Sequence, residues 1–96
     1  MIKAQRFWSK YLRDKVETAN KALKTKNITL LEEILDDLIN SLKNPQADWK
    51  DRVAICFILE QMAGIEPLIK KIVQSLKAVL EKETDVHVRE FAVLSL

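Results

Sequence analysis

Glycine, proline, cysteine and histidine are all scarce in this 96-residue sequence. With a single glycine, the chain cannot form a glycine-rich phosphate loop. One glycine and two prolines also argue against a β-sandwich or a β-barrel, because these folds need many turns. One cysteine excludes an internal disulfide, and a single histidine beside it argues against a zinc site made of these ligands within one chain. The composition therefore excludes more chemistry than it supports.

Long apolar runs are missing as well. The longest, residues 53–59, has seven residues, whereas a membrane-spanning helix needs about 20. Residues 1–22 are amphipathic and charged, and they lack the apolar centre of a secretory signal. We therefore expect a cytoplasmic protein without a membrane partner. The unpaired Cys56 agrees with a reducing compartment.

The balance of 48% hydrophobic and 31% charged residues is typical of a globular protein. A chain of this length buries enough surface for one modest core, so we expect a single domain over residues 1–96.

Hydrophobic residues recur at steps of three or four along most of the chain, which is the spacing of one face of a helix. The pattern predicts an all-α fold of five helices joined by short connections, with no strands. The expected helices cover residues 2–24, 29–43, 48–63, 66–80 and 85–96. The third contains the run at 53–59 and is apolar on all sides, so it should lie at the centre of the domain.

Short polar signals predict where these helices begin and end. Thr29 and Glu32 have the spacing of a capping box at the start of the second helix. Asp48 and Asp85 are expected to be the N-caps of the third and fifth helices. Gly64 stands where the end of a helix favours a left-handed residue.

Shifting the chain by 37 residues superimposes two helix pairs. The matched residues are Leu31 with Leu68, Leu35 with Ile72, Ile39 with Leu76, Leu42 with Val79, Asp48 with Asp85, Arg52 with Arg89, and Leu59 with Leu96. Amphipathic helices share apolar spacing by chance, so the Asp–Arg pair at the same spacing is the more informative match.

At these residues the sequence resembles the HEAT-repeat family. In the second unit, Leu76, Val79 and Leu80 end a helix, a polar turn follows, and then come Asp85, Val88, Arg89, Ala92 and Leu96 at the family's spacing. In the first unit Asp48, Arg52 and Leu59 match, while Asp51 replaces the usual valine and Ile55 the usual small residue. The resemblance covers about residues 28–96.

This resemblance implies a right-handed α-α superhelix. A basic capping helix (1–27) would precede one repeat at 28–64 and a second at 65–96. It also implies that Asp48, Arg52, Asp85 and Arg89 form a structural polar ladder between the units and do not bind a ligand. Each helix pair would leave an apolar face for its neighbour to cover.

The charge is unevenly distributed along the chain. Residues 1–27 contain eight Lys or Arg and two acidic residues, a net charge of +6, whereas residues 28–96 contain eight and twelve, a net charge of −4. The basic segment either packs on the acidic helix that follows it or binds a partner such as nucleic acid. The candidate residues for a partner surface are Lys3, Arg6, Lys10 and Arg13, with Trp49 as an aromatic anchor. Trp49 could instead staple the turn before it.

No catalytic constellation is recognisable. His87 has no nucleophile or orienting acid near it in the pattern of a hydrolase, and Cys56 lies in the most apolar run, where a thiol is inert. The acidic residues of the second helix are more typical of a solvated face than of a cation site, and they are Glu32, Glu33, Asp36 and Asp37. We therefore expect no enzyme, no metal and no cofactor.

These observations favour a small, non-catalytic interaction or scaffold module that binds another protein. The alternative is a nucleic-acid-binding protein that uses the basic N-terminal helix. The last helix ends in an apolar run without a polar cap, at residues 91–96. This predicts a homodimer through the terminal helices, or a longer array of which this chain is a part.

Overall fold

The computed structural model describes residues 1–83 and 85–95. Its elements are α1 (Lys10–Lys24), α2 (Ile28–Lys43), α3 (Trp49–Met62), the short 3-10 helix η1 (Glu66–Leu68), α4 (Ile69–Lys82) and α5 (Val86–Ser95). Five α-helices and no strand occur in this part of the chain, which confirms the all-α prediction. Leu96, paired above with Leu59, lies outside the described residues.

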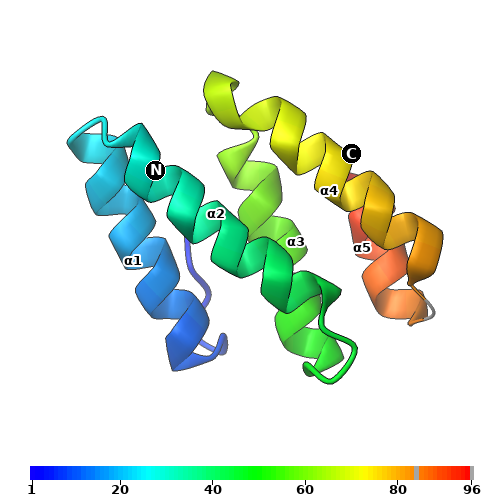
Figure 1. The fold of residues 1–96 in the computed structure, drawn as a ribbon. Helices are drawn as coiled ribbons and strands as arrows, with labels where there is room; N and C mark the ends of the chain where they lie inside the picture. The colour runs from blue at the N-terminus through cyan, green and yellow to red at the C-terminus, as the bar shows by residue number, and fades with distance from the viewer. Residues whose placement is uncertain (84, 96) are drawn as a thin grey trace.

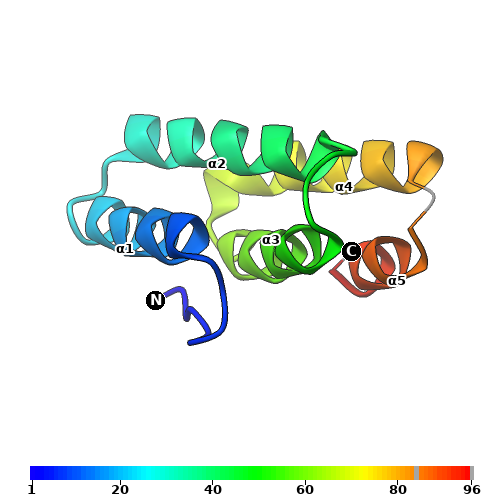
Figure 2. The ribbon, with the colours of Figure 1, turned by 90° about the horizontal axis from the view of Figure 1, so that it is seen from below.

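The helices form two layers, because successive helices alternate from one layer to the other. Figure 2 shows α2 and α4 in one layer and α1, α3 and α5 side by side in the other. Each helix packs on the next across the layers, and α3 also contacts both α1 and α5 within its own layer. The contact between α3 and α5 is the most extensive of all, and Figure 1 shows α3 between the outer helices.

The third helix lies at the centre of the domain, as its apolar run predicted. It contacts α1, α2, α4 and α5. Six of the seven residues at 53–59 are buried, and Phe57, which is 40% exposed, is the exception. The buried side chains of all five helices join in one core cluster.

The first helix begins at Lys10, not at Ile2 as the periodicity predicted. The Ser9 side chain caps it by accepting a hydrogen bond from the backbone N–H of Leu12. Residues 1–9 contain no helix and include a turn closed by a hydrogen bond from Trp8 N–H to Gln5 O. The N-terminal segment follows this path because distant side chains bind its backbone, as described below.

Two of the predicted N-caps are confirmed. Asp48 accepts a hydrogen bond from Lys50 N–H at 3.0 Å. Asp85 accepts hydrogen bonds from the N–H groups of His87 and Val88, at 2.9 and 3.3 Å. Each aspartate thereby satisfies backbone donors that would otherwise lack a partner within the helix.

Two other local predictions are wrong. The N-cap of α2 is Asn27, whose side chain accepts from Leu30 N–H, so Thr29 lies inside the helix. Gly64 does not have a positive φ, and the left-handed residue is Lys26, with φ of 57°, in the turn after α1. Asparagine is as good an N-cap as threonine, and it stands one residue before the helix begins.

Candidate functional site

Arg52 joins three helices in the interior. Its Nε donates to the carbonyl oxygen of Leu42, near the end of α2, at 2.8 Å. Its guanidinium forms an ion pair with Glu83, which follows α4, and both side chains are under a tenth exposed. The carbonyls at a helix end carry partial negative charge, so a cation is stabilising there. Arg52 therefore holds the ends of α2 and α4 together.

Arg89 on α5 makes a similar contact with the end of α4. Its Nη1 donates to the carbonyl oxygen of Leu80 at 2.7 Å and to that of Glu83 at 3.3 Å. Both arginines expected in the polar ladder thus bind the end of the preceding helix. Asp48 caps the start of α3 and Asp85 the start of α5. Arg52 also pairs with Glu83, at the end of α4, and no sequence pattern indicated this partner.

The predicted basic residues all lie on the surface of the N-terminal part of the chain. Lys3, Arg6, Lys10 and Arg13 are all exposed. Lys3 lines a hollow against α3, whereas Arg13 lines a different hollow against α1. Trp49 lies at the start of α3 and lines neither. Of the five candidate residues, only Lys3 and Arg13 line a hollow, and they line different ones.

The basic first helix does pack against the acidic second helix, as one of the two alternatives predicted. Lys15 Nζ donates to a carboxylate oxygen of Asp37 at 2.6 Å, and this hydrogen bond raises the pKa of Lys15. Asp36 forms an ion pair with Lys71 of α4. In the described part of the chain, no cluster of three or more His, Cys, Asp or Glu could hold a metal ion.

Two aromatic pairs connect α3 with α5 at the surface. The rings of Trp49 and His87 stack, with centroids 4.2 Å apart. The rings of Phe57 and Phe91 pack at an angle, with centroids 4.9 Å apart. Trp49 is 38% exposed and Phe57 40% exposed. We call these four residues the aromatic strip.

Helix periodicity places the α3 members of the strip on one side. Residues 49, 53, 57 and 61 follow at intervals of four, so they lie along one face of the helix. The sequence indicates only Trp49 of these residues as an aromatic anchor. Phe57 lies in an apolar run that predicts a wholly buried helix. Its ring partner Phe91, and the Trp49 partner His87, lie more than 30 residues away along the chain, which local periodicity does not reveal.

A hollow of about 510 Å³ adjoins the strip between the N-terminal segment and α3. It is lined by Lys3, Gln5, Phe7, Trp8, Lys50, Val53, Ala54, Phe57 and Gln61. The Lys50 ammonium lies 5.9 Å from the centre of the Trp49 ring, in the range of a cation–π contact. The hollow and the strip together present aromatic surface with two lysines.

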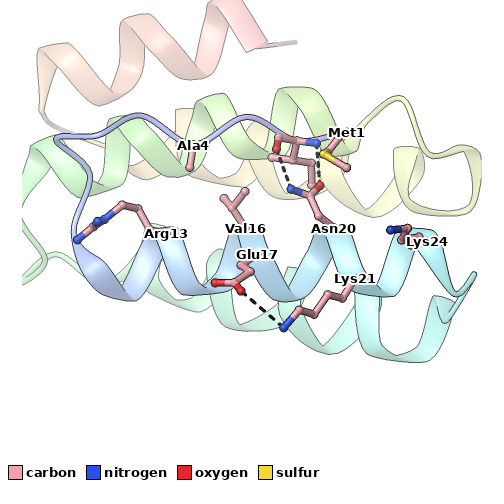
Figure 3. A pocket seen from close by; sticks show the side chains of 9 residues that line it. Met1, Ala4, Arg13, Val16, Glu17, Asn20, Lys21 and Lys24 are labelled. Carbon is pink, nitrogen blue, oxygen red and sulfur yellow. Dashed lines mark hydrogen bonds and ion pairs between the residues drawn. The ribbon is translucent and has the colours of Figure 1, made fainter.

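A second hollow, of about 350 Å³, lies between the start of the chain and α1 (Figure 3). Met1 and Ala4 border it on one side, and Val16 and Asn20 on the other. The Asn20 side chain points at the N-terminal segment and binds its backbone. The lining also contains four charged residues. Arg13, Lys21 and Lys24 are cationic, and Glu17 is acidic.

Cys56 is fully buried on α3. Burial penalises the charged thiolate and raises the pKa of Cys56 to about 11, although the nearby positive charge of Arg52 lowers it in part. Nucleophilic chemistry requires the thiolate, so this thiol is inert at neutral pH.

Comparison with known proteins does not assign the chain to a family. No protein-family model matches it, and neither does a curated protein or a solved structure. Within residues 1–83 and 85–95, no helix has the length and apolar character needed to cross a membrane.

Proposed function

We propose that this chain is a small, non-catalytic, HEAT-like module that binds another protein through the aromatic strip and the hollow beside it. The observation that carries the proposal is the pair of exposed aromatic contacts between α3 and α5, next to a hollow with two lysines. Aromatic side chains are enriched at the energetic centres of protein interfaces. The aromatic rings favour an apolar partner surface, and the lysines favour acidic residues on it.

The HEAT-like part of the proposal is supported by the equivalence of the two units. Helices alternate between two layers, and the sequence repeats at an offset of 37 residues. Arg52 and Arg89, which are related by that offset, both donate to carbonyl oxygens at the end of the preceding helix. In such repeats, successive helix pairs build an extended binding surface.

Site-specific photo-crosslinking tests this function. A benzophenone amino acid is placed at position 57 of the full chain, and a control chain carries it at Gln74, which is exposed on α4 in the other layer. We expect irradiation in a cell extract to give a discrete crosslinked species from position 57 and none from position 74. Excess wild-type protein should compete for this species, whereas the Trp49→Ala/Phe57→Ala variant should not.

Equal crosslinking from both positions, or none from position 57, would contradict the proposal. Circular dichroism of each variant shows whether the fold is retained, so that a lost partner is not confused with a lost structure.

Nucleic-acid binding is the second candidate, because Phe7 is 83% exposed next to exposed Lys3 and Arg6. Aromatic rings and cations together bind single strands, and phosphate contacts make the affinity fall with salt. Replacement of Lys3, Arg6, Lys10 and Arg13 by Gln should then abolish binding to a fluorescent oligonucleotide. Absent or salt-insensitive binding of the wild type would exclude this alternative.

A further inference from the structure

The first five residues of the chain are bound on the protein surface as a segment without helix, which we call the N-terminal strap (residues 1–5). Figure 2 shows the start of the chain on the side of α1 and α3 that faces away from α2 and α4. The strap therefore crosses the outside of the three-helix layer.

Two side-chain amides bind the backbone of the strap. Asn20 on α1 accepts from Ile2 N–H at 2.9 Å, and its Nδ2 donates to Ile2 O at 2.9 Å. Gln61 on α3 accepts from Lys3 N–H at 2.8 Å, and its Nε2 donates to Lys3 O at 3.3 Å. Each amide thus satisfies both polar backbone groups of one residue, in the way that a neighbouring strand does.

This recognition depends on the backbone more than on side chains. Of the strap residues, only Ile2 is buried, with 4% of its surface exposed, and Met1, Lys3 and Ala4 are exposed. The contacts thus require an extended peptide with one aliphatic side chain. The strap also leaves the 350 Å³ hollow beside Ala4 open, with Arg13 in its lining (Figure 3).

We propose that the place where Asn20 of α1 and Gln61 of α3 bind the strap, which we call the furrow, is a receptor site for an extended peptide of a partner protein, and that the strap is its built-in competitor. The partner peptide carries an aliphatic residue at the position of Ile2 and an acidic residue at the position of Ala4.

The acidic residue enters the hollow, whose lining keeps a net positive charge. Lys21 forms an ion pair with Glu17, and Arg13 Nε donates to the Trp8 carbonyl oxygen, so the carboxylate meets Lys24 and the remaining N–H groups of Arg13. Displacement of the strap is then the step that regulates binding.

A partner peptide suits this furrow better than the strap of a second copy. The strap of a second copy makes the same contacts as the resident strap, which a short connection keeps at high effective concentration. A peptide with an acidic side chain gains a charge contact that Ala4 does not make. Residues 6–9 connect the strap to α1. In this connection Trp8 is buried, and Ser9 caps α1 independently of the strap. This proposal does not rest on the aromatic strip.

The test uses the full chain with a loosened strap and capped synthetic peptides. Ile2→Ser removes the buried aliphatic side chain and so weakens the strap without changing Asn20 or Gln61. Lys3→Pro, which removes the Lys3 N–H, is the second loosened variant should the first not fold. The probes are Met-Ile-Lys-Ala-Gln and Met-Ile-Lys-Glu-Gln. Binding is followed by nuclear magnetic resonance of the side-chain amide groups of Asn20 and Gln61.

We expect both peptides to bind the loosened chain, the acidic one more tightly, and the wild type to bind each about tenfold more weakly. Asn20→Leu in the loosened chain should weaken binding by about tenfold, because two hydrogen bonds are lost. Asn40→Leu is the matched control, since Asn40 is exposed on α2. It should change nothing.

Equal binding by the wild type and the loosened chain would overturn the proposal, as would binding that Asn20→Leu leaves unchanged. A dimer of the wild type in which the strap of one subunit crosslinks to Asn20 of the other would also overturn it, because the occupant would then be a second copy. Lys3 and Gln5 of the strap also line the 510 Å³ hollow. The crosslinking test at position 57 leaves the strap sequence unchanged and uses no peptide, so the two proposals can fail separately.

Discussion

The Arg52 side chain joins the ends of two separate helices, α2 and α4. Arg52→Met removes the guanidinium from a buried carboxylate, that of Glu83, and from the Leu42 carbonyl. We expect the free energy of unfolding to fall by about 3–5 kcal/mol, as for other buried pairs that lose one partner. Arg89→Met should cost about 1 kcal/mol, because Arg89 is exposed and its contacts compete with water.

Urea denaturation of both variants measures this difference. The Arg52→Met/Glu83→Gln double variant should lose less than the sum of its single variants, because the two residues interact. Additive losses would show that the ion pair contributes little.

The Cys56 thiol should not react in the native protein. At pH 8 it is almost entirely protonated, since burial raises the pKa of Cys56 to about 11. We expect Ellman's reagent to label no thiol in the folded chain and the single thiol once guanidinium is added.

The pH dependence of stability follows from the same shift. The folded state retains the thiol proton at a pH where the unfolded state, with a pKa near its ordinary value of 9.0, has lost it. The stabilisation from this group is therefore complete below about pH 9 and is lost as the pH rises towards 11.

For the labelling experiment, reaction of the native Cys56 thiol with Ellman's reagent at pH 8 would contradict the structure.

Gly64 should tolerate alanine. Its φ is not positive, and a Cβ added there meets only the Gln61 carbonyl oxygen, at an ordinary 3.5 Å. Alanine also reduces the freedom of the unfolded chain, so Gly64→Ala should raise the free energy of unfolding by about 0.4–1 kcal/mol. A lower thermal midpoint for this variant would contradict this expectation and would support the left-handed conformation that the sequence predicted for Gly64.

At the level of the helices, α2 begins with Asn27 as its N-cap and not with the capping box of Thr29 and Glu32 that the sequence predicted. Asn27→Ala should destabilise the protein by about 1 kcal/mol, because Leu30 N–H loses its acceptor. Thr29→Ala should change stability by less than about 0.5 kcal/mol, since Thr29 is exposed within the helix. Chemical denaturation of the two variants compares them directly, and a larger loss for Thr29→Ala would favour the capping box.

The N-terminal segment shows, at the same scale, how a tertiary contact overrides periodicity. The sequence has helical spacing from residue 2, yet α1 begins at Lys10. The hydrogen bonds that Asn20 and Gln61 make with Ile2 and Lys3 replace those that an added helical turn would have made. Separations of 18 and 58 residues place these contacts beyond any local pattern.

At the scale of the molecule, α5 leaves apolar side chains uncovered. Val86, Val93 and Leu94 are all exposed on this terminal helix. Exposed apolar side chains grouped on one helix favour association with another molecule. We therefore expect the chain to dimerise through α5, and Val93→Glu/Leu94→Glu to give a monomer.

Light scattering after size exclusion measures the mass at high and low salt. The Gln74→Glu variant is the charge control, because Gln74 lies on the exposed side of α4. A wild type that remains monomeric at high concentration would refute the dimer.

The helical class, the five α-helices of residues 1–83 and 85–95, and the caps at Asp48 and Asp85 can all be read from the sequence alone. These features depend on interactions within about four residues, which periodicity and capping rules describe. The tertiary structure decided the path of the strap, the Arg52–Glu83 pair and the aromatic strip. Each of these joins residues that are distant in the chain, and only the packing of helices in two layers brings them together.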